Sequence, residues 1–559
     1  MPSDTEPLPR VARIRSLLFA LPTTDRRWGA GLRAAAAVAI PGAALIATGH
    51  ADTALFVIFG AFAVLYGEGR AYRVRAWVTL TAGAWLLVST ALGALAGFLL
   101  SAGPAATTAL VLLVTGIGMT AVFVVDALRL GPPGGMFFAL VGGGALAAAE
   151  SGTSLSAILV AAALGVAASA LVSMAGAVID PHGPERAAVG RAVRAVDVYS
   201  SPGHATAEAR HAAGEAISWA WSTLHDARLP ERRPESTLST TLLAAHGRFS
   251  AVDREDEAIQ GAERPTQLPV ARPGAWYRLR RSATTRSHAA CTMLRVGVAG
   301  LVAGSVSAAA GLDRPQWAIL SVLVVLQTGP DRRRGLTRGL HRVAGTIAGL
   351  ALFAVIYELS WTGYRQLAVI VVLQFCIEVF ISRNYGIAAA FITPVALLAS
   401  GTGAGHAAPV ETVIRDRLVE TAIGVLIALL SMYLVAPQGH RRTFHWTEER
   451  VRAAALHLLE VARTEPVDGA LFTDRRNLQF ELVGAARAGI DSAHNDLVWS
   501  RRNWPARAAL IHRGYDLLAA CWATPPGQLL IATEQWENDF RAEPDPYRDG
   551  GRQTPPARR

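Results

Sequence analysis

The chain has 559 residues, of which 52% are hydrophobic and 17% charged, and its mean hydropathy is +0.31. Soluble globular proteins carry about 25% charged residues, so this composition excludes a string of ordinary soluble domains. The formal net charge is +10, and all 53 basic residues are arginine because the sequence has no lysine. The lack of lysine excludes a P-loop NTPase site and a Schiff-base or general-base lysine. Three scattered cysteines exclude a disulfide framework.

Long apolar runs predict membrane-spanning helices, each of which needs about 20 mostly apolar residues. The sequence holds two groups of six such runs, and a polar region follows each group. The first group is 28–48, 53–67, 77–100, 105–127, 134–149 and 154–179. The second group is 290–310, 316–328, 343–358, 366–382, 385–400 and 416–436. Several of these runs are shorter than 20 residues.

The fold class we predict is an all-α polytopic membrane protein with two parallel six-span repeats, each followed by a helical cytoplasmic region. The polar regions are predicted to be helical because their apolar residues recur at helical spacing. The tail has the composition of a disordered segment. The expected domains are an N-terminal cytoplasmic segment 1–27, a first repeat 28–180, a cytoplasmic helical region 181–289, a second repeat 290–437, a cytoplasmic helical domain 438–543 and a disordered tail 544–559.

Arginine in the short loops predicts the orientation, because positive residues are retained on the cytoplasmic side. With the N-terminus inside, the inside loops hold ten arginines: Arg70, Arg73, Arg75, Arg129, Arg332, Arg333, Arg334, Arg338, Arg342 and Arg383. The outside connections hold four: Arg314, Arg365, Arg415 and Arg417. We therefore expect a multi-pass protein of the cytoplasmic membrane with both termini and both polar regions in the cytoplasm.

The two groups of spans resemble each other in sequence. Leu32-Arg33 recurs as Leu294-Arg295 after 262 positions, and Gly42 recurs as Gly304 at the same offset. Gly165 matches Gly424 after 259 positions. A nearly constant offset indicates duplication, and six spans per half give both halves the same orientation. Transport pathways commonly lie between such repeats.

Several motifs of the second half resemble a known family. They are Trp317-Ala318-Ile319-Leu320, Gln327, Arg338, the run from Arg342 to Gly349, Asn384-Tyr385, the run from Phe391 to Pro394, and the run from Arg417 to Gly424. They resemble the core of the fusaric acid resistance (FUSC) proteins, which are related to aromatic acid exporters and more distantly to the aluminium-activated malate transporters of plants. The resemblance covers about 28–180 and 290–437 and is clearer in the second half. In the first half Ala84 follows Gly83 where the second has Gly-Thr, and Leu80 stands opposite Arg342.

This resemblance implies a secondary transporter that exports aromatic or other organic acids, and it leaves open whether protons drive the export. A passive organic-anion channel is the alternative that the plant relatives suggest. A membrane-embedded enzyme is less favoured, since the outside loops offer only isolated Asp52, Glu150 and Asp313. We expect no enzyme activity, cofactor, metal or nucleic acid. The expected partners are a small organic anion and the lipid bilayer, and homo-oligomerisation stays open.

A charged or polar group inside a membrane is a functional candidate because its burial is costly. Glu378 lies in an apolar run, with Gln374 four residues earlier on the same helical face. A buried carboxylate can carry a proton, although Glu378 could equally form a structural pair with an arginine of another span. Asp126 is a further candidate, and its alternative is an interface pair with Arg129.

Several other polar residues could act on an anionic substrate. Arg33 and Arg295 occupy matching positions in the two halves and could bind a carboxylate through their planar forks, or they could extend to the membrane surface. Gln327 is a pathway candidate. Arg338 and Arg342 are interpreted either as topology determinants or as a cytoplasmic funnel for anions.

Overall fold

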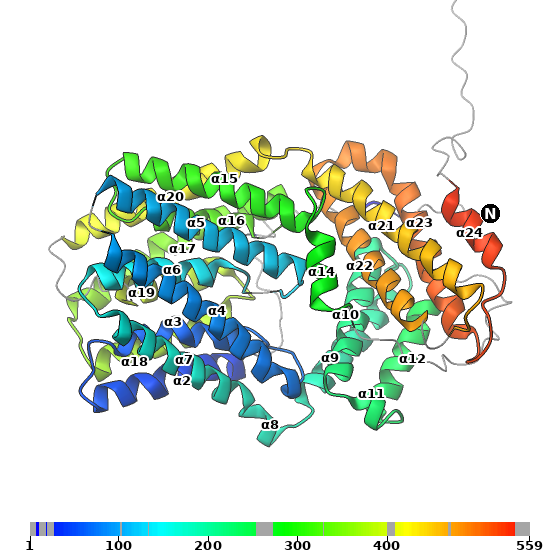
Figure 1. Cartoon of the computed structure of the whole chain (residues 1–559), viewed down its shortest axis with the longest axis horizontal. Coiled ribbons are helices and arrows are strands. Elements are labelled where there is room, and N and C mark those ends of the chain that lie inside the picture. The colour runs from blue at the N-terminus through cyan, green and yellow to red at the C-terminus, as the bar shows by residue number, and fades with distance from the viewer. Residues whose placement is uncertain are drawn as a thin grey trace, which may run out of the picture. The chain divides into compact units, whose positions relative to one another are not determined.

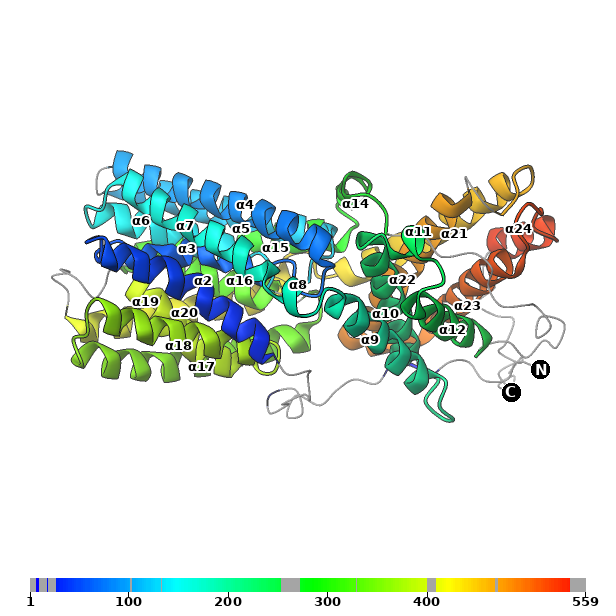
Figure 2. The same cartoon turned by 90° about the horizontal axis from the view of Figure 1, so that it is seen from below.

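The computed structural model describes residues 7–9, 18, 27–100, 103–131, 133–252, 272–327, 329–399, 409–467 and 471–542. Within these ranges the chain is helical and forms no β-strand. It divides into two compact units, each drawn in Figures 1 and 2. The larger unit contains Val11–Ala187 and Gly274–Arg442, and the smaller contains Met1–Arg10, Ala188–Pro273 and Thr443–Arg559. The tail for which we predict disorder, 544–559, lies outside the described residues, as does most of the segment 1–27.

The larger unit holds the apolar helices of both halves. Those of the first half are α2 (Trp28–Ala47), η1 (Ala54–Phe56), α3 (Val57–Ala61), η2 (Phe62–Leu65), α4 (Tyr72–Leu99), α5 (Pro104–Ala127), α6 (Met136–Glu150), α7 (Leu155–Met174) and α8 (Gly176–Ile179). Those of the second half are α15 (His288–Ala309), α16 (Gln316–Leu326), α17 (Arg332–Glu358), α18 (Tyr364–Phe380), α19 (Tyr385–Ala399) and α20 (Val410–Leu434), and the polar helix α14 (Ala275–Ser282) precedes them. In both views the long helices of this unit run along a common direction (Figures 1 and 2).

Seven helices in the described ranges are long and apolar enough to cross a membrane. They are α2, α4, α5, α7 continued by α8, α15, α17 and α20. The described residues therefore form a helical fold with seven candidate membrane spans. Four other apolar segments are shorter, namely η1–α3–η2, α6, α16 and α19.

The short helices are inner helices of the unit. At 1.5 Å per residue the 11 residues of α16 rise about 16 Å, against about 30 Å of hydrocarbon in a bilayer. Every residue of α16 is buried, and so are 13 of the 15 residues of α6. Short or irregular backbone is tolerated at membrane depth where protein surrounds it, so these helices need not span the bilayer by themselves.

Two helices of the second half begin earlier than the sequence predicts. α17 begins at Arg332 instead of 343, because the Asp331 carboxylate accepts hydrogen bonds from the backbone N–H groups of Arg333 (2.9 Å) and Arg334 (3.2 Å). α20 begins at Val410 instead of 416. The interpretation of Arg342 and Arg417 as loop charges is therefore wrong, since both are buried within these helices, and Arg75 is likewise buried within α4. Without these three buried arginines, eight of the tallied arginines remain inside and three outside, and the bias keeps its direction.

The same packing pairs occur in both halves. α4 packs on α6 and α7, and correspondingly α17 packs on α19 and α20. α7 contacts α2 and α3, as α20 contacts α15 and α16. Across the halves, α2 contacts α18 and α15 contacts α5, so the first long helix of each half meets the fourth helix of the other.

The smaller unit is a helical bundle with apolar cores. Its helices are α10 (Ala207–Asp226), α11 (Leu229–Arg232), α12 (Thr237–Ala251), α22 (Leu471–Asn495), α23 (Leu497–Ala523) and α24 (Thr533–Arg541), and it takes most of α9 (Gly183–Tyr199) and α21 (Gly439–Ala462). Tyr515 of α23 contacts the apolar cluster of α9, α10 and α12 as well as the cluster of α21 to α23. The two polar regions, which lie far apart in the sequence, thus form one unit.

Candidate functional site

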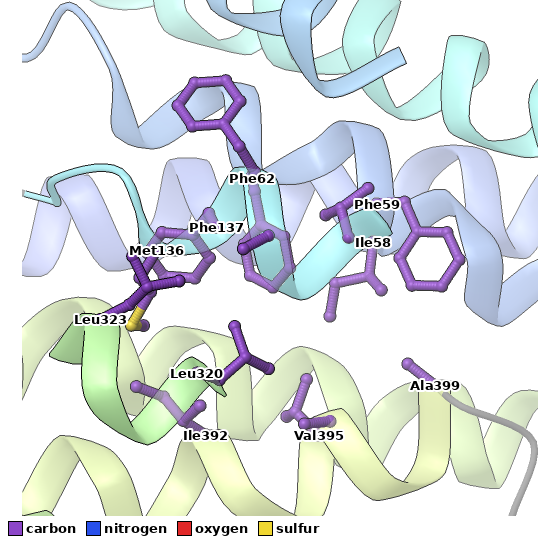
Figure 3. Packing of buried hydrophobic residues seen from close by; sticks show 14 of the residues in the cluster. Ile58, Phe59, Phe62, Met136, Phe137, Leu320, Leu323, Ile392, Val395 and Ala399 are labelled. Carbon is purple, nitrogen blue, oxygen red and sulfur yellow. The ribbon is translucent and has the colours of Figure 1, made fainter. Parts of the chain in front are cut away.

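An apolar cavity lies between the two halves of the larger unit. Its volume is about 20 Å³, which is room for about one water molecule. The lining residues are Ile58, Phe59, Phe62, Phe137, Leu140 and Gly144 of the first half, and Trp317, Ile377, Ile392, Val395, Ala396 and Ala399 of the second. All but Ile377 lie on the short inner helices. Figure 3 shows Ile58 and Phe62 lying opposite Ile392 and Val395 across this interface.

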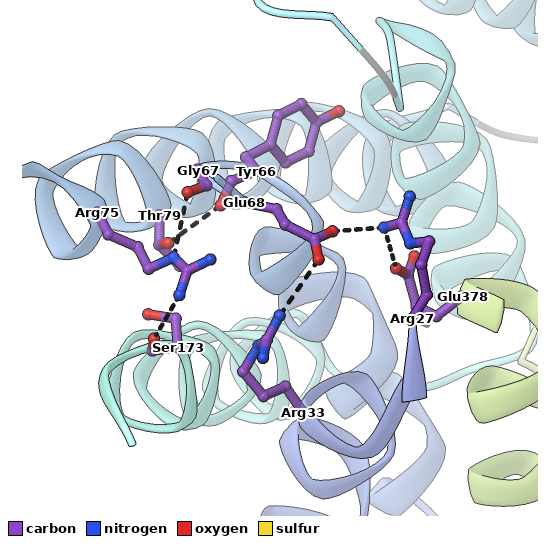
Figure 4. A network of polar contacts seen from close by, with 9 residues as sticks. All are labelled: Arg27, Arg33, Tyr66, Gly67, Glu68, Arg75, Thr79, Ser173 and Glu378. Atoms are coloured by element: carbon purple, nitrogen blue, oxygen red, sulfur yellow. Dashed lines mark hydrogen bonds and ion pairs between the residues drawn. The ribbon is translucent and has the colours of Figure 1, made fainter. Parts of the chain in front are cut away.

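Glu378 follows the cavity-lining residue Ile377 in the sequence and lies close to the end of α18. Its side chain is 5% exposed, and its carboxylate lies 3.2 Å from the guanidinium of Arg27, which directly precedes α2. Arg27 also pairs with Glu68, whose other oxygen lies 3.3 Å from Arg33 (Figure 4). The network therefore joins the second half to the first through a single arginine.

The loop that carries Glu68 is held by Arg75 and by two glycines. Arg75 is buried and donates hydrogen bonds to the carbonyl oxygens of Gly67 (3.1 Å) and Ser173 (3.3 Å), as Figure 4 shows. Gly67 and Gly69 adopt φ values of 84° and 74°, which favour glycine. Glu68 is thereby presented toward Arg27 and Arg33 from a fixed turn.

The remaining candidates, Asp126, Gln374 and Gln327, each have different neighbours. Asp126 lies 3.5 Å from His288 at the start of α15, a partner that the sequence reasoning did not consider. Gln374 is buried one turn before Glu378, and within the described residues its Oε1 has no hydrogen-bond partner. Gln327 directly follows α16, and its side chain lies against Gly134, where an added Cβ would be 2.5 Å from Oε1.

The matching arginines Arg33 and Arg295 have different partners. Arg33 belongs to the network around Glu68. Arg295 donates to the carbonyl oxygens of Val435 (3.0 Å) and Ala436 (2.9 Å), and so satisfies the end of α20. The structure brings only Arg33 together with Glu378, through Arg27 and Glu68.

Arg338 and Arg342 both contact Tyr385, the first residue of α19. The Arg338 guanidinium lies 3.9 Å from the centre of the Tyr385 ring, and Arg342 donates to the Tyr385 hydroxyl over 3.4 Å. Arg342 is 2% exposed. These two arginines of α17 therefore connect it to α19 through their contacts with Tyr385.

Sequence reasoning missed Arg417, Trp317 and Glu420 as site residues. The Arg417 guanidinium carbon lies 3.5 Å from the centre of the Trp317 ring, and Trp317 lines the cavity. Glu420 is buried and accepts a hydrogen bond from the Arg314 backbone N–H over 3.2 Å. The available signal was an arginine and a glutamate three residues apart at the start of an apolar run, where α20 begins earlier than predicted.

Comparison with known proteins finds a family similar to the second half. Residues 301–431 match the family described as fusaric acid resistance protein-like. Over 298 residues the chain is 28% identical to the "Uncharacterized membrane protein YvaC" of Bacillus subtilis (strain 168), a match that covers 52% of this chain. The match covers 43% of that protein, so the chain spans less than half of this curated relative. No solved structure matches the chain.

The matched range contains the motifs on which the family resemblance rests. It runs from within α15 into α20 and includes Trp317, Arg338, Arg342 and Arg417. The resemblance stated from these motifs is thus confirmed. Residues 301–431 are therefore similar to the fusaric acid resistance protein-like membrane proteins.

Proposed function

We propose that the chain is a secondary transporter that exports organic anions, such as aromatic acids, across the cytoplasmic membrane. The observation that carries the proposal is the apolar cavity between the halves, lined almost entirely by inner helices too short to span a bilayer. Discontinuous or short helices at the interface between repeats are where transporters place their binding sites. A cavity of about 20 Å³ admits no organic acid, so substrate entry requires the halves to move apart.

Two parallel six-span repeats are part of this proposal. The support is the exchange of partners across the halves, α2 with α18 and α15 with α5, together with equal pairs inside each half. Close backbone approaches also correspond. A Cβ added at Gly165 would lie 2.1 Å from the Val57 carbonyl oxygen, and one at Gly424 would lie 2.2 Å from that of Ala318. Movement of one repeat against the other would open the cavity to either side.

The position of Glu378 supports proton coupling as part of this proposal. In the observed state its carboxylate shares Arg27 with Glu68, so this arginine ties α18 to the start of α2. Protonation of Glu378 removes the charge that Arg27 neutralises and weakens the link between the halves. A proton taken up at Glu378 would thereby be coupled to the separation of the halves.

The test is flux of an aromatic acid such as benzoate into or out of proteoliposomes under an imposed pH gradient. Glu378→Gln keeps the shape of the side chain but cannot titrate, and we expect its flux to lose all response to the gradient. Glu358→Gln, an exposed glutamate at the end of α17, is the matched control and should behave like the wild type. Gradient-coupled flux that survives Glu378→Gln would overturn the coupling role. Single-channel currents without coupled accumulation would instead identify a passive anion channel.

A further inference from the structure

Arg417 is a buried cation whose donors have no acceptor among the described residues. It is 2% exposed, and its Nε and both terminal nitrogens are buried without a hydrogen-bond partner. Burying a charge without pairing it is costly, and proteins retain such groups where they carry function. An arginine presents its donors as a rigid fork that matches the two oxygens of a carboxylate. The empty donor set of Arg417 therefore has the chemistry of an anion site.

Trp317 holds the guanidinium in place. The ring lies over the guanidinium carbon at 3.5 Å, a cation–π contact that partly offsets the missing acceptor. Stacking of this kind uses the face of the guanidinium, whereas its N–H groups point outward in its plane. The contact thus orients Arg417 and leaves its hydrogen-bond donors available.

The groups around Arg417 carry both signs of charge, and those with acceptors are engaged elsewhere. Its charged and titratable neighbours are Arg342, Glu420, Tyr385 and Arg314. The carboxylate of Glu420 accepts a hydrogen bond from the Arg314 backbone N–H, and the carboxylate of Asp416 pairs with Arg415. Arg314 also has the acidic neighbours Glu150 and Asp313, so it is the unpaired donors of Arg417, and not a count of the surrounding charges, that favour an anion. The Thr421 hydroxyl, one helical turn after Arg417, is also buried without a partner in the described structure and offers a donor.

The same tryptophan connects this cation to the cavity. Trp317 lines the apolar space between the halves, whose other walls are aliphatic and aromatic side chains. We propose that Arg417 binds the carboxylate of the transported anion while the apolar body of that anion occupies the widened cavity beside Trp317. The ligand class is a monocarboxylate with an aromatic or other apolar body. This inference rests on the proposed transport function and names its binding residue.

The test is equilibrium binding to the purified full-length protein in detergent, measured by calorimetry with benzoate and with its uncharged amide, benzamide. We expect benzoate to bind the wild type and benzamide to bind at least about tenfold more weakly, since the charge-assisted hydrogen bonds are lost. Arg417→Lys keeps a positive charge without the fork and should weaken benzoate at least tenfold. Arg365→Lys, an exposed arginine at the start of α18, is the matched control.

A second variant guards against misfolding of the first. Trp317→Leu retains Arg417 but removes the ring that orients it, and we expect weaker benzoate binding with unchanged helix content by circular dichroism. Equal benzoate affinity in the wild type and in either variant would overturn the inference, as would equal binding of benzamide and benzoate by the wild type. If benzoate binds through Arg417 but no aromatic acid crosses proteoliposome membranes, the transport function fails while the binding site stands.

Discussion

His246 in the smaller unit shows how burial sets the charge state of a single residue. It lies on α12, where the Trp221 indole N–H donates to its Nδ1 over 3.1 Å, and its ring centre lies 3.9 Å from that of Trp522. Burial lowers the pKa of His246 to about 3. The imidazole is therefore neutral in the folded unit at any pH at which the protein functions.

This burial predicts a loss of stability in acid. In the unfolded chain the imidazole pKa is about 6.5, so below that pH the unfolded state binds a proton that the folded state rejects. The contribution of neutral His246 to the free energy of unfolding is complete well above pH 6.5 and declines as the pH falls toward 3. At pH 5.5 the free energy of unfolding is lower by about 1.4 kcal/mol than at high pH. Hydrogen exchange measured by mass spectrometry should show α10 and α12 opening more readily at pH 5.5 than at pH 7.5.

His246→Asn supplies the control for this prediction. Its side-chain oxygen can still accept the Trp221 hydrogen bond but does not titrate. We expect the variant to lose most of the difference in protection between the two pH values. If the variant and the wild type show the same acid response in α10 and α12, titration of His246 is not its cause.

At the same scale, Glu378 could be predicted as a candidate site residue from the sequence, whereas Arg417 could not. Glu378 interrupts a long apolar run, and a lone carboxylate among apolar residues needs no three-dimensional knowledge to be noticed. Arg417 stands near the edge of an apolar run, where a loop arginine and a buried one look alike. The distinction depends on where α20 begins and on the Trp317 ring, which is contributed by another helix. Neither the start of α20 nor the position of the Trp317 ring can be recognised from the residues next to Arg417 in the sequence.

Among the elements, the helices lie where apolar runs predict them, but their roles depend on packing. The runs at 53–67 and 316–328 were short in the sequence, and they correspond to η1–α3–η2 and α16. The sequence could not show that these short helices are enclosed by the long ones. That arrangement depends on glycines that let backbones approach closely, and an Ala- and Gly-rich chain offers many glycines that have no such role.

Gly424 is one of the glycines that the packing requires. A Cβ there would lie 2.2 Å from the Ala318 carbonyl oxygen of α16. This oxygen belongs to the backbone, so no side-chain rotation can relieve the clash. Gly424→Ala should force α20 away from α16 and cost at least about 1–3 kcal/mol, seen as a lower melting temperature in detergent. Gly116→Ala on α5 is the matched control, since a Cβ there meets nothing within 4 Å. A melting temperature equal to that of the wild type for Gly424→Ala would contradict the close packing of these helices.

For the whole molecule, the orientation in the membrane and the relation between the halves form one testable prediction. Asp52 and Asp313 each follow the first long helix of their half, and both are exposed. Parallel repeats with the N-terminus inside place both residues on the outer face, whereas inverted repeats would place them on opposite faces. Cysteines introduced at these positions, in a chain without its three native cysteines, should both react with a membrane-impermeant maleimide in right-side-out vesicles.

A cysteine at Ala205, in the exposed turn between α9 and α10, reports on the other face. The arginine bias, eight against three after correction, predicts that it reacts only in inside-out or permeabilised vesicles. Labelling at 52 and 313 from opposite faces would refute the parallel repeat. Labelling at both positions only from the inner face would support the parallel repeat and contradict the predicted orientation. The two outcomes are independent, because the relation between the halves does not depend on the direction of insertion. Both halves supply the walls of the cavity under either relation between them, so the labelling at 52 and 313 tests the relation between the halves, and the labelling at 205 tests the orientation that the arginine bias predicts.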